Sequence, residues 1–151
     1  MNQQLTGAAG VFHVASELSM AGWVALPSIR NVKGADILVA DPDGKRFAFL
    51  QVKTSKSKVT FWPIGEGARK WRGRNCYYAF VRRVGDRFEV FLEKAVVVAR
   101  ESEANDRAAA KRGNKKWAPW WALTGQDASE DAKERTHRQW EAFLLGPNEG
   151  K

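Results

Sequence analysis

Two β-rich runs that flank a strong turn sequence constrain the fold of this chain more than any other feature. Residues 35–40 and 47–54 are rich in branched and aromatic side chains, and Asp41-Pro-Asp-Gly-Lys45 lies between them. Proline presets the backbone for a turn, and an Asp-Gly pair tolerates the positive φ angles that tight turns require. The sequence therefore predicts a β-hairpin in the first third of the chain.

Helix-forming and strand-forming segments on either side of this hairpin predict a mixed α/β fold. The expected helices are residues 5–21, 93–111 and 129–145. The expected further strands are residues 23–26, 76–82 and 87–92. Residues 117–121 are expected to be irregular. We expect one domain, residues 1–151, in which helices flank a central mixed sheet.

The composition excludes several classes of protein. Of the 151 residues, 44% are apolar and seven are tryptophan, which is too hydrophobic for a disordered chain. One cysteine and two histidines exclude an internal disulfide framework and a Cys/His zinc site. No apolar run approaches the ~20 residues that cross a bilayer. The start of the chain lacks the charged region of a signal peptide, so we expect a cytoplasmic protein without membrane contact.

Four polar residues around the hairpin are candidates for chemistry. Glu17 lies at the border of the apolar stripe of the first helix, and Asp36 enters an apolar strand, where its burial is costly without a partner. Gln51 and Lys53 share one face of the strand over residues 47–54 because side chains alternate along a strand. Each residue alone is also compatible with an ordinary solvated position. Together they place acids and a cation at one end of the hairpin.

These residues give the chain a resemblance to the PD-(D/E)XK nuclease superfamily. The similarity covers about residues 7–56 and is carried by four stretches: residues 10–18, Ala21-Gly-Trp23, Gly34-Ala-Asp-Ile37 and Gln51-Val-Lys-Thr-Ser55. The first half is most similar to Holliday-junction-resolvase-like members and to small homing and restriction enzymes. The resemblance implies a restriction-endonuclease-like fold.

The same resemblance implies a role for each of the four residues. Asp36, Gln51 and Glu17 would hold Mg²⁺, for which Mn²⁺ can substitute, and Lys53 would assist the attack of water on a phosphodiester. Gln51 stands where the superfamily usually has a second acid, so the site has at most two carboxylates. Such a site is expected to bind Mg²⁺ weakly until substrate phosphate completes its coordination.

Basic residues are concentrated directly after this strand. The net charge is +8, and seven of the 25 Lys and Arg residues lie between positions 53 and 74 with one acid among them. Six of them are expected to contact DNA phosphates: Lys56, Lys58, Arg69, Lys70, Arg72 and Arg74. The alternative is a solvated loop anchored by Trp62 and Trp71. For residues 117–121, packing of the tryptophans is favoured over a stacking platform for bases.

The sequence thus predicts a Mg²⁺-dependent endonuclease that hydrolyses DNA. A duplex requires two cuts and a chain of this size carries one site, so we expect a homodimer or homotetramer. The alternative is a protein of the same fold that binds nucleic acid without cleaving it. A nuclease that acts on RNA is a third candidate, although no 2′-hydroxyl-reading motif supports it.

Overall fold

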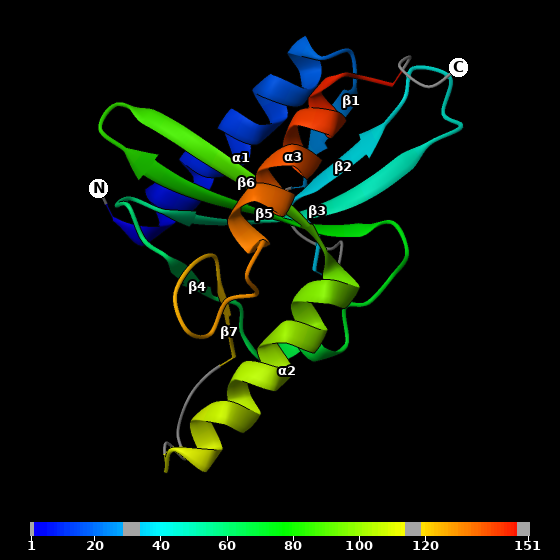
Figure 1. Ribbon diagram of the computed structural model, residues 1–151. Coiled ribbons are helices and arrows are strands. Elements are labelled where there is room, and N and C mark those ends of the chain that lie inside the picture. Colours follow the sequence, from blue (N-terminus) through cyan, green and yellow to red (C-terminus); the bar gives the residue numbers. More distant parts are fainter. Residues whose placement is uncertain (1, 29–33, 114–118, 148–151) are drawn as a thin grey trace.

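The structure is a computed structural model that describes residues 2–28, 34–113 and 119–147. It contains three α-helices, one short 3₁₀ helix and seven strands in these residues (Figure 1). The elements are α1 (Gln3–Met20), β1 (Val24–Pro27), β2 (Ile37–Ala40), β3 (Phe47–Ser55), β4 (Phe61–Pro63), η1 (Glu66–Arg69), β5 (Cys76–Val84), β6 (Arg87–Lys94), α2 (Ala95–Lys111), β7 (Trp120–Ala122) and α3 (Ala132–Leu144). Within the described residues, none of the helices has the length and hydropathy needed to cross a membrane.

A five-stranded sheet forms the centre of the fold, in the order β1-β2-β3-β5-β6. The pair β3 and β5 is parallel, and the other neighbours are antiparallel. The mixed sheet flanked by helices confirms the predicted fold class. The predicted hairpin is also present: Lys45 N–H donates to Asp41 Oδ1 at 2.7 Å, and Gly44 adopts a φ of 69°.

The two faces of this sheet are covered by different elements. The face that carries Leu50, Val52 and Ala79 packs against α1 through Val14 and Leu18, and we call it the α1 face. The opposite face carries Tyr78 and Phe80, and we call it the α2 face because α2 packs there together with β4 and β7. In Figure 1, α2 extends to the opposite end of the molecule from α1 and α3.

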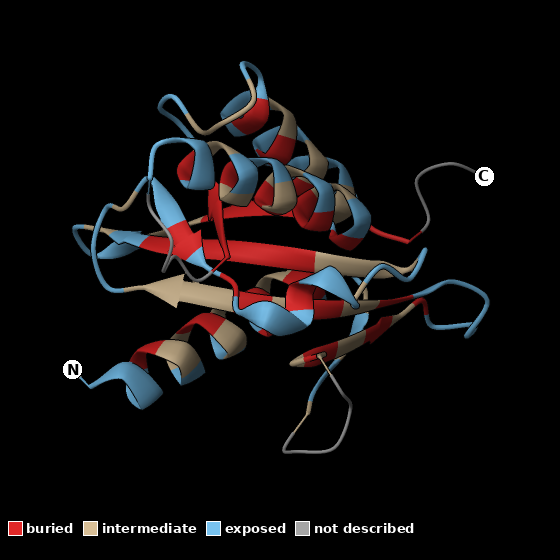
Figure 2. Cartoon of the chain, turned by 90° about the horizontal axis from the view of Figure 1, so that it is seen from below, coloured by how far each residue is buried: buried red, intermediate tan, exposed pale blue. Residues whose placement is uncertain are grey.

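Helix α3 closes the fold along the edge strand β6. Its Trp140 joins the cluster on the α1 face, and its Ala132 joins the cluster on the α2 face. Ala132, Thr136 and Trp140 of this helix are buried, whereas Phe143 and Leu144 are only partly buried. Buried residues are concentrated in the strands and on the inner sides of the helices (Figure 2).

Two short strands form outside the predicted strands, one in the basic segment 55–74 and one at the end of the segment expected to be irregular. Within 55–74, β4 and η1 form, and Trp120–Ala122 forms β7, which pairs with β4. The prediction that residues 117–121 are irregular was therefore wrong for Trp120 and Trp121, which belong to β7. Strands of three residues carry no periodicity, and only their pairing with each other defines them. Trp120 and Trp121 are buried, which confirms packing for these two residues; Trp117 and the basic residues Lys115 and Lys116 lie outside the described residues.

Helix α1 approaches β3 so closely that one position has no room for a side chain. A Cβ atom added at Gly10 would lie 1.8 Å from Thr54 Oγ1 and 2.8 Å from Thr54 Cβ. Gly10→Ala is therefore expected to force α1 away from the sheet and to destabilise the fold by about 1–3 kcal/mol. Gly7→Ala, one turn earlier, has nothing within 4 Å and serves as the control. Urea unfolding of both variants measures the difference; equal stability would contradict the close contact.

Candidate active site

Asp36 lies where the pairing between β2 and β3 ends. The register places Ile37 opposite Leu50, so Asp36 lies next to Gln51 at the start of the hairpin. The backbone N–H of Val52 donates to Asp36 Oδ2 at 2.7 Å, and the Asp36 N–H donates to Leu50 O. The Asp36 carboxylate thus accepts a backbone N–H from β3 beyond Ile37 and Leu50, the last paired residues of the two strands. This hydrogen bond fixes one carboxylate oxygen and leaves the other available to a ligand.

Lys53 shares the α2 face with Gln51 and lies near Asp36. Strand alternation puts both side chains on the face opposite Leu50 and Val52, and both are half-buried. Burial lowers the pKa of Lys53 below its ordinary value of 10.5, and the nearby charge of Asp36 offsets part of this effect. The structure therefore brings three of the four predicted residues together: an acid, an amide and a partly desolvated cation.

Glu17 is not brought together with these three residues. It lies on α1, which covers the other face of the sheet, and Trp140 Nε1–H of α3 donates to its Oε2 at 3.1 Å. His13 Nε2 lies 3.5 Å from the other oxygen, Oε1. In the part of the chain that the structure describes, no hydrogen bond or ion pair joins Glu17 to Asp36, Gln51 or Lys53. These contacts give Glu17 a role in joining α1 to α3.

Two aromatic residues that the sequence did not single out as site residues, Trp71 and Tyr78, lie next to Gly34 and Gln51. A Cβ atom at Gly34 would lie 2.9 Å from Trp71 Nε1, so the Trp71 indole covers the backbone just before Asp36. Tyr78 lies beside Gln51 in the parallel register, is fully buried and packs edge-on against Trp71. Burial and the neighbouring Cys76 raise the pKa of Tyr78 to about 12, so its hydroxyl stays protonated. The sequence of residues 76–82 predicted a strand, but it did not predict that Tyr78 would lie beside Gln51.

The six basic residues expected to contact DNA fall into two groups. Arg69 pairs with Asp106 and Arg72 with Glu103, and both partners lie on α2. These two guanidinium groups hold the η1 segment against α2 and are less available to a phosphate. The other four are exposed, and no ion pair to a carboxylate is found for them among the described residues: Lys56, Lys58, Lys70 and Arg74.

The oxygen atoms at this site suit Mg²⁺ only if a substrate supplies further ligands. Asp36 offers one free carboxylate oxygen and Gln51 an amide oxygen. No cluster of three or more His, Cys, Asp or Glu side chains that could hold a metal occurs among the described residues. Mg²⁺ commonly keeps several waters and binds through one or two carboxylates together with substrate phosphates. The residues present fit that substrate-completed mode and do not form a metal cage.

Comparisons with known proteins define the class of fold. The mixed sheet flanked by helices is an endonuclease-like fold. A solved structure with this fold is that of a bacterial homing endonuclease, I-Ssp6803I, which matches with a TM-score of 0.51. The match covers 95% of this chain and 91% of that chain, at 15% sequence identity. No family model matches the sequence, and no curated protein matches it.

Proposed function

We propose that this protein is a metal-dependent endonuclease of the PD-(D/E)XK type that hydrolyses DNA phosphodiester bonds. The observation that carries the proposal is the placement of the Asp36 carboxylate, held by the Val52 amide, beside the half-buried Lys53. The fold, which is similar to that of a homing endonuclease, supports the same conclusion. The net charge of +8 and the exposed cations after β3 suit a nucleic-acid substrate.

Each residue of the site has a defined task in this proposal. Asp36 presents its free oxygen to the metal, and its other oxygen stays fixed by the Val52 N–H. Gln51 adds a neutral oxygen ligand from the same sheet face. Lys53 donates a hydrogen bond to the attacking water or to a phosphate oxygen and stabilises the negative charge that grows on the phosphate. A bound Mg²⁺ or Mn²⁺ would polarise the phosphate and lower the pKa of a coordinated water.

The competing function is binding without cleavage. It is favoured by one observation: the three clustered residues include a single carboxylate, because Glu17 is engaged by Trp140. A charge of −1 holds a divalent cation weakly unless phosphate joins the site. In that case the exposed lysines would bind nucleic acid and no phosphodiester bond would be broken.

Cleavage assays of wild-type protein and of Lys53→Met distinguish an endonuclease from a protein that binds DNA without cleaving it. Single-turnover cleavage of supercoiled plasmid and of branched DNA is measured in Mg²⁺, in Mn²⁺ and in EDTA, with RNA as a further substrate. The wild type is expected to cleave DNA only with metal, and Lys53→Met to lower the rate about 10²–10⁴-fold. Lys58→Met, an exposed lysine near the same strand, is the matched control and is expected to weaken binding slightly. Tight binding of all substrates without cleavage would favour the competing function.

The same variant tests the burial of Lys53 through stability. The folded-state pKa lies below the ordinary 10.5, so the unfolded chain binds this proton more tightly. A charged Lys53 therefore costs stability at neutral pH, and the cost disappears as the pH rises from the lowered pKa through 10.5. Lys53→Met is expected to melt no lower than the wild type at pH 7. Its advantage should shrink at high pH in thermal unfolding; a lower melting temperature at pH 7 would argue against a buried, functional lysine.

A further inference from the structure

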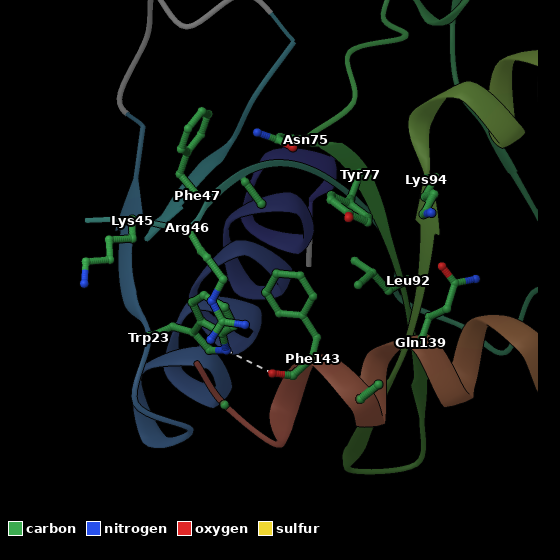
Figure 3. A pocket seen from close by; sticks show the side chains of 13 residues that line it. Trp23, Lys45, Arg46, Phe47, Asn75, Tyr77, Leu92, Lys94, Gln139 and Phe143 are labelled. Atoms are coloured by element: carbon green, nitrogen blue, oxygen red, sulfur yellow. Dashed lines mark hydrogen bonds between the residues drawn. The ribbon is translucent and has the colours of Figure 1, made fainter. Parts of the chain in front are cut away.

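A cavity of about 530 Å³ opens on the α1 face (Figure 3). Neither Asp36 nor Lys53 is among the described residues that line it. Its floor is formed by Ala48, Tyr77 and Leu92, from three neighbouring strands of the sheet. One wall comes from α3 through Gln139 and Phe143, and Trp23 lies beside Phe143. The volume falls in the range of about 300–1,000 Å³ that small-molecule sites occupy.

The aromatic side of this cavity is held in a fixed arrangement. The Trp23 indole stacks on Phe143 with ring centroids 4.9 Å apart, and Trp23 Nε1–H donates to the Phe143 carbonyl oxygen at 2.9 Å. Tyr77 meets the same Phe143 ring edge-on at 5.9 Å. The guanidinium of Arg46 lies over the Trp23 ring, 5.3 Å from its centroid. A flat cationic group thus already rests on the indole, and both Arg and aromatic rings stack on nucleobases.

The polar groups of the cavity are cationic or neutral. Lys45, Arg46 and Lys94 supply positive charge, and Asn75 supplies an amide that can pair with the edge of a base. Gln139 adds an amide oxygen, since its Nε2 donates to Glu93 Oε1 at 3.2 Å. Among the described residues that line the cavity there is no aspartate or glutamate. Asp41, outside this lining, lies with its Oδ2 3.8 Å from Arg46 Nε. Figure 3 shows Trp23, Arg46 and Phe143 on one side and Tyr77, Lys94 and Gln139 on the other. A purely apolar ligand would leave the cations unused, and an inorganic anion would leave the rings unused.

We propose that this cavity is a second binding site that takes a nucleotide unit, either a free nucleotide or an unpaired nucleotide of a strand. The base would stack on the Arg46 guanidinium, which already lies over the Trp23 indole, and the phosphate would be held by Lys94 on the other side of the cavity. The site lies on the opposite sheet face from Asp36, so it can be occupied independently of cleavage. The proposal does not depend on the nuclease activity proposed above.

The test uses the full chain carrying Asp36→Asn, in EDTA, so that cleavage plays no part. Binding of dAMP, of deoxyadenosine and of a fluorescently labelled (dA)₁₀ oligonucleotide is measured by calorimetry and anisotropy. Arg46→Gln and Lys94→Gln are each expected to weaken binding about tenfold, the first by loss of stacking on the base and the second by loss of one charge-assisted hydrogen bond to the phosphate. Deoxyadenosine, which lacks the phosphate, should bind more weakly than dAMP by a similar factor. Lys133→Gln, an exposed lysine of α3 outside this cavity, is the matched control.

The outcomes distinguish the two sources of the ligand. Binding of dAMP and of the oligonucleotide supports a site for free nucleotide, and binding of the oligonucleotide alone supports an unpaired nucleotide in a strand. The indole N–H resonance of Trp23 should shift on binding in either case, which gives a readout that requires no cavity variant. The proposal is overturned if neither ligand saturates, or if binding is insensitive to Arg46→Gln and Lys94→Gln and leaves the Trp23 resonance unmoved.

Discussion

Asp36→Asn is expected to abolish DNA cleavage while leaving the fold and metal-free DNA binding intact. In the wild type the Val52 N–H donates to Asp36 Oδ2 at 2.7 Å, and an asparagine keeps a side-chain oxygen that can accept this hydrogen bond. The backbone at the start of β2 is therefore expected to be unchanged. It removes the one carboxylate of the Asp36, Gln51 and Lys53 cluster. The cleavage rate should fall at least as far as the loss of a general acid or base lowers it, about 10²–10⁴-fold. Single-turnover nicking of supercoiled plasmid in Mg²⁺ measures the change.

A matched acid separates this effect from a general change of charge. Asp86→Asn alters an exposed residue in the turn between β5 and β6 and removes the same charge. It is expected to cleave like the wild type. Electrophoretic mobility shifts in EDTA should show DNA binding by Asp36→Asn at least as tight as by the wild type, because one negative charge has been removed. Retained cleavage by Asp36→Asn would show that the catalytic centre does not include Asp36.

Arg135→Met is expected to cause the largest loss of stability of any single substitution considered for this chain. Arg135 Nε and Nη2 donate to Glu93 Oε2 at 3.0 and 2.8 Å, and Glu93 is 1% exposed. Burial alone would lower the pKa of Arg135, but the hydrogen bond to Glu93 and the charges of Glu93, Glu101 and Asp131 outweigh it, so the pKa is raised. Removal of the guanidinium leaves a buried carboxylate without its cation, which costs about 3–5 kcal/mol.

The control and the rescue use neighbouring residues. Arg138→Met breaks an exposed pair with Glu134 in the same helix, which is expected to cost under about 1 kcal/mol. Adding Glu93→Gln to Arg135→Met removes the stranded charge, while the Lys94 N–H can still donate to the remaining oxygen. The double variant should therefore regain part of the lost stability. Chemical unfolding measures all three, and equal losses for Arg135→Met and Arg138→Met would contradict a central role for the Glu93 pair.

The sequence predicted the elements with strong local signals and missed those defined by distant pairing. The turn at Asp41-Pro-Asp-Gly-Lys45 and the three helical segments carry their own periodicity or turn chemistry, and all appear within a few residues of their expected positions. Strands β4 and β7 are three residues each and exist because they pair with each other across about sixty positions of sequence. No local pattern encodes such a pair.

The site was predictable to the extent that the hairpin register fixes it. Asp36 directly precedes β2, and Gln51 and Lys53 lie on the adjacent strand β3, so the turn and the alternation of side chains place the three together. The position of the Glu17 side chain depended on the path of α1 across the sheet. The indole N–H of Trp140, 123 residues away in the sequence, donates a hydrogen bond to its carboxylate. The pairing of Arg69 and Arg72 with α2 likewise required the position of a helix that begins after residue 94.

The most direct test of the proposed endonuclease follows binding and cleavage on one DNA sample. Wild-type protein is bound in EDTA to end-labelled plasmid-derived or branched DNA, the complex is quantified, and excess Mg²⁺ or Mn²⁺ is then added. We expect the bound DNA to be converted to shorter products in a single-exponential phase, and the same complex with Asp36→Asn to remain intact. DNA that stays bound and uncut with both metals, on linear, supercoiled and branched substrates, would contradict the proposal and identify a protein that binds without cleaving.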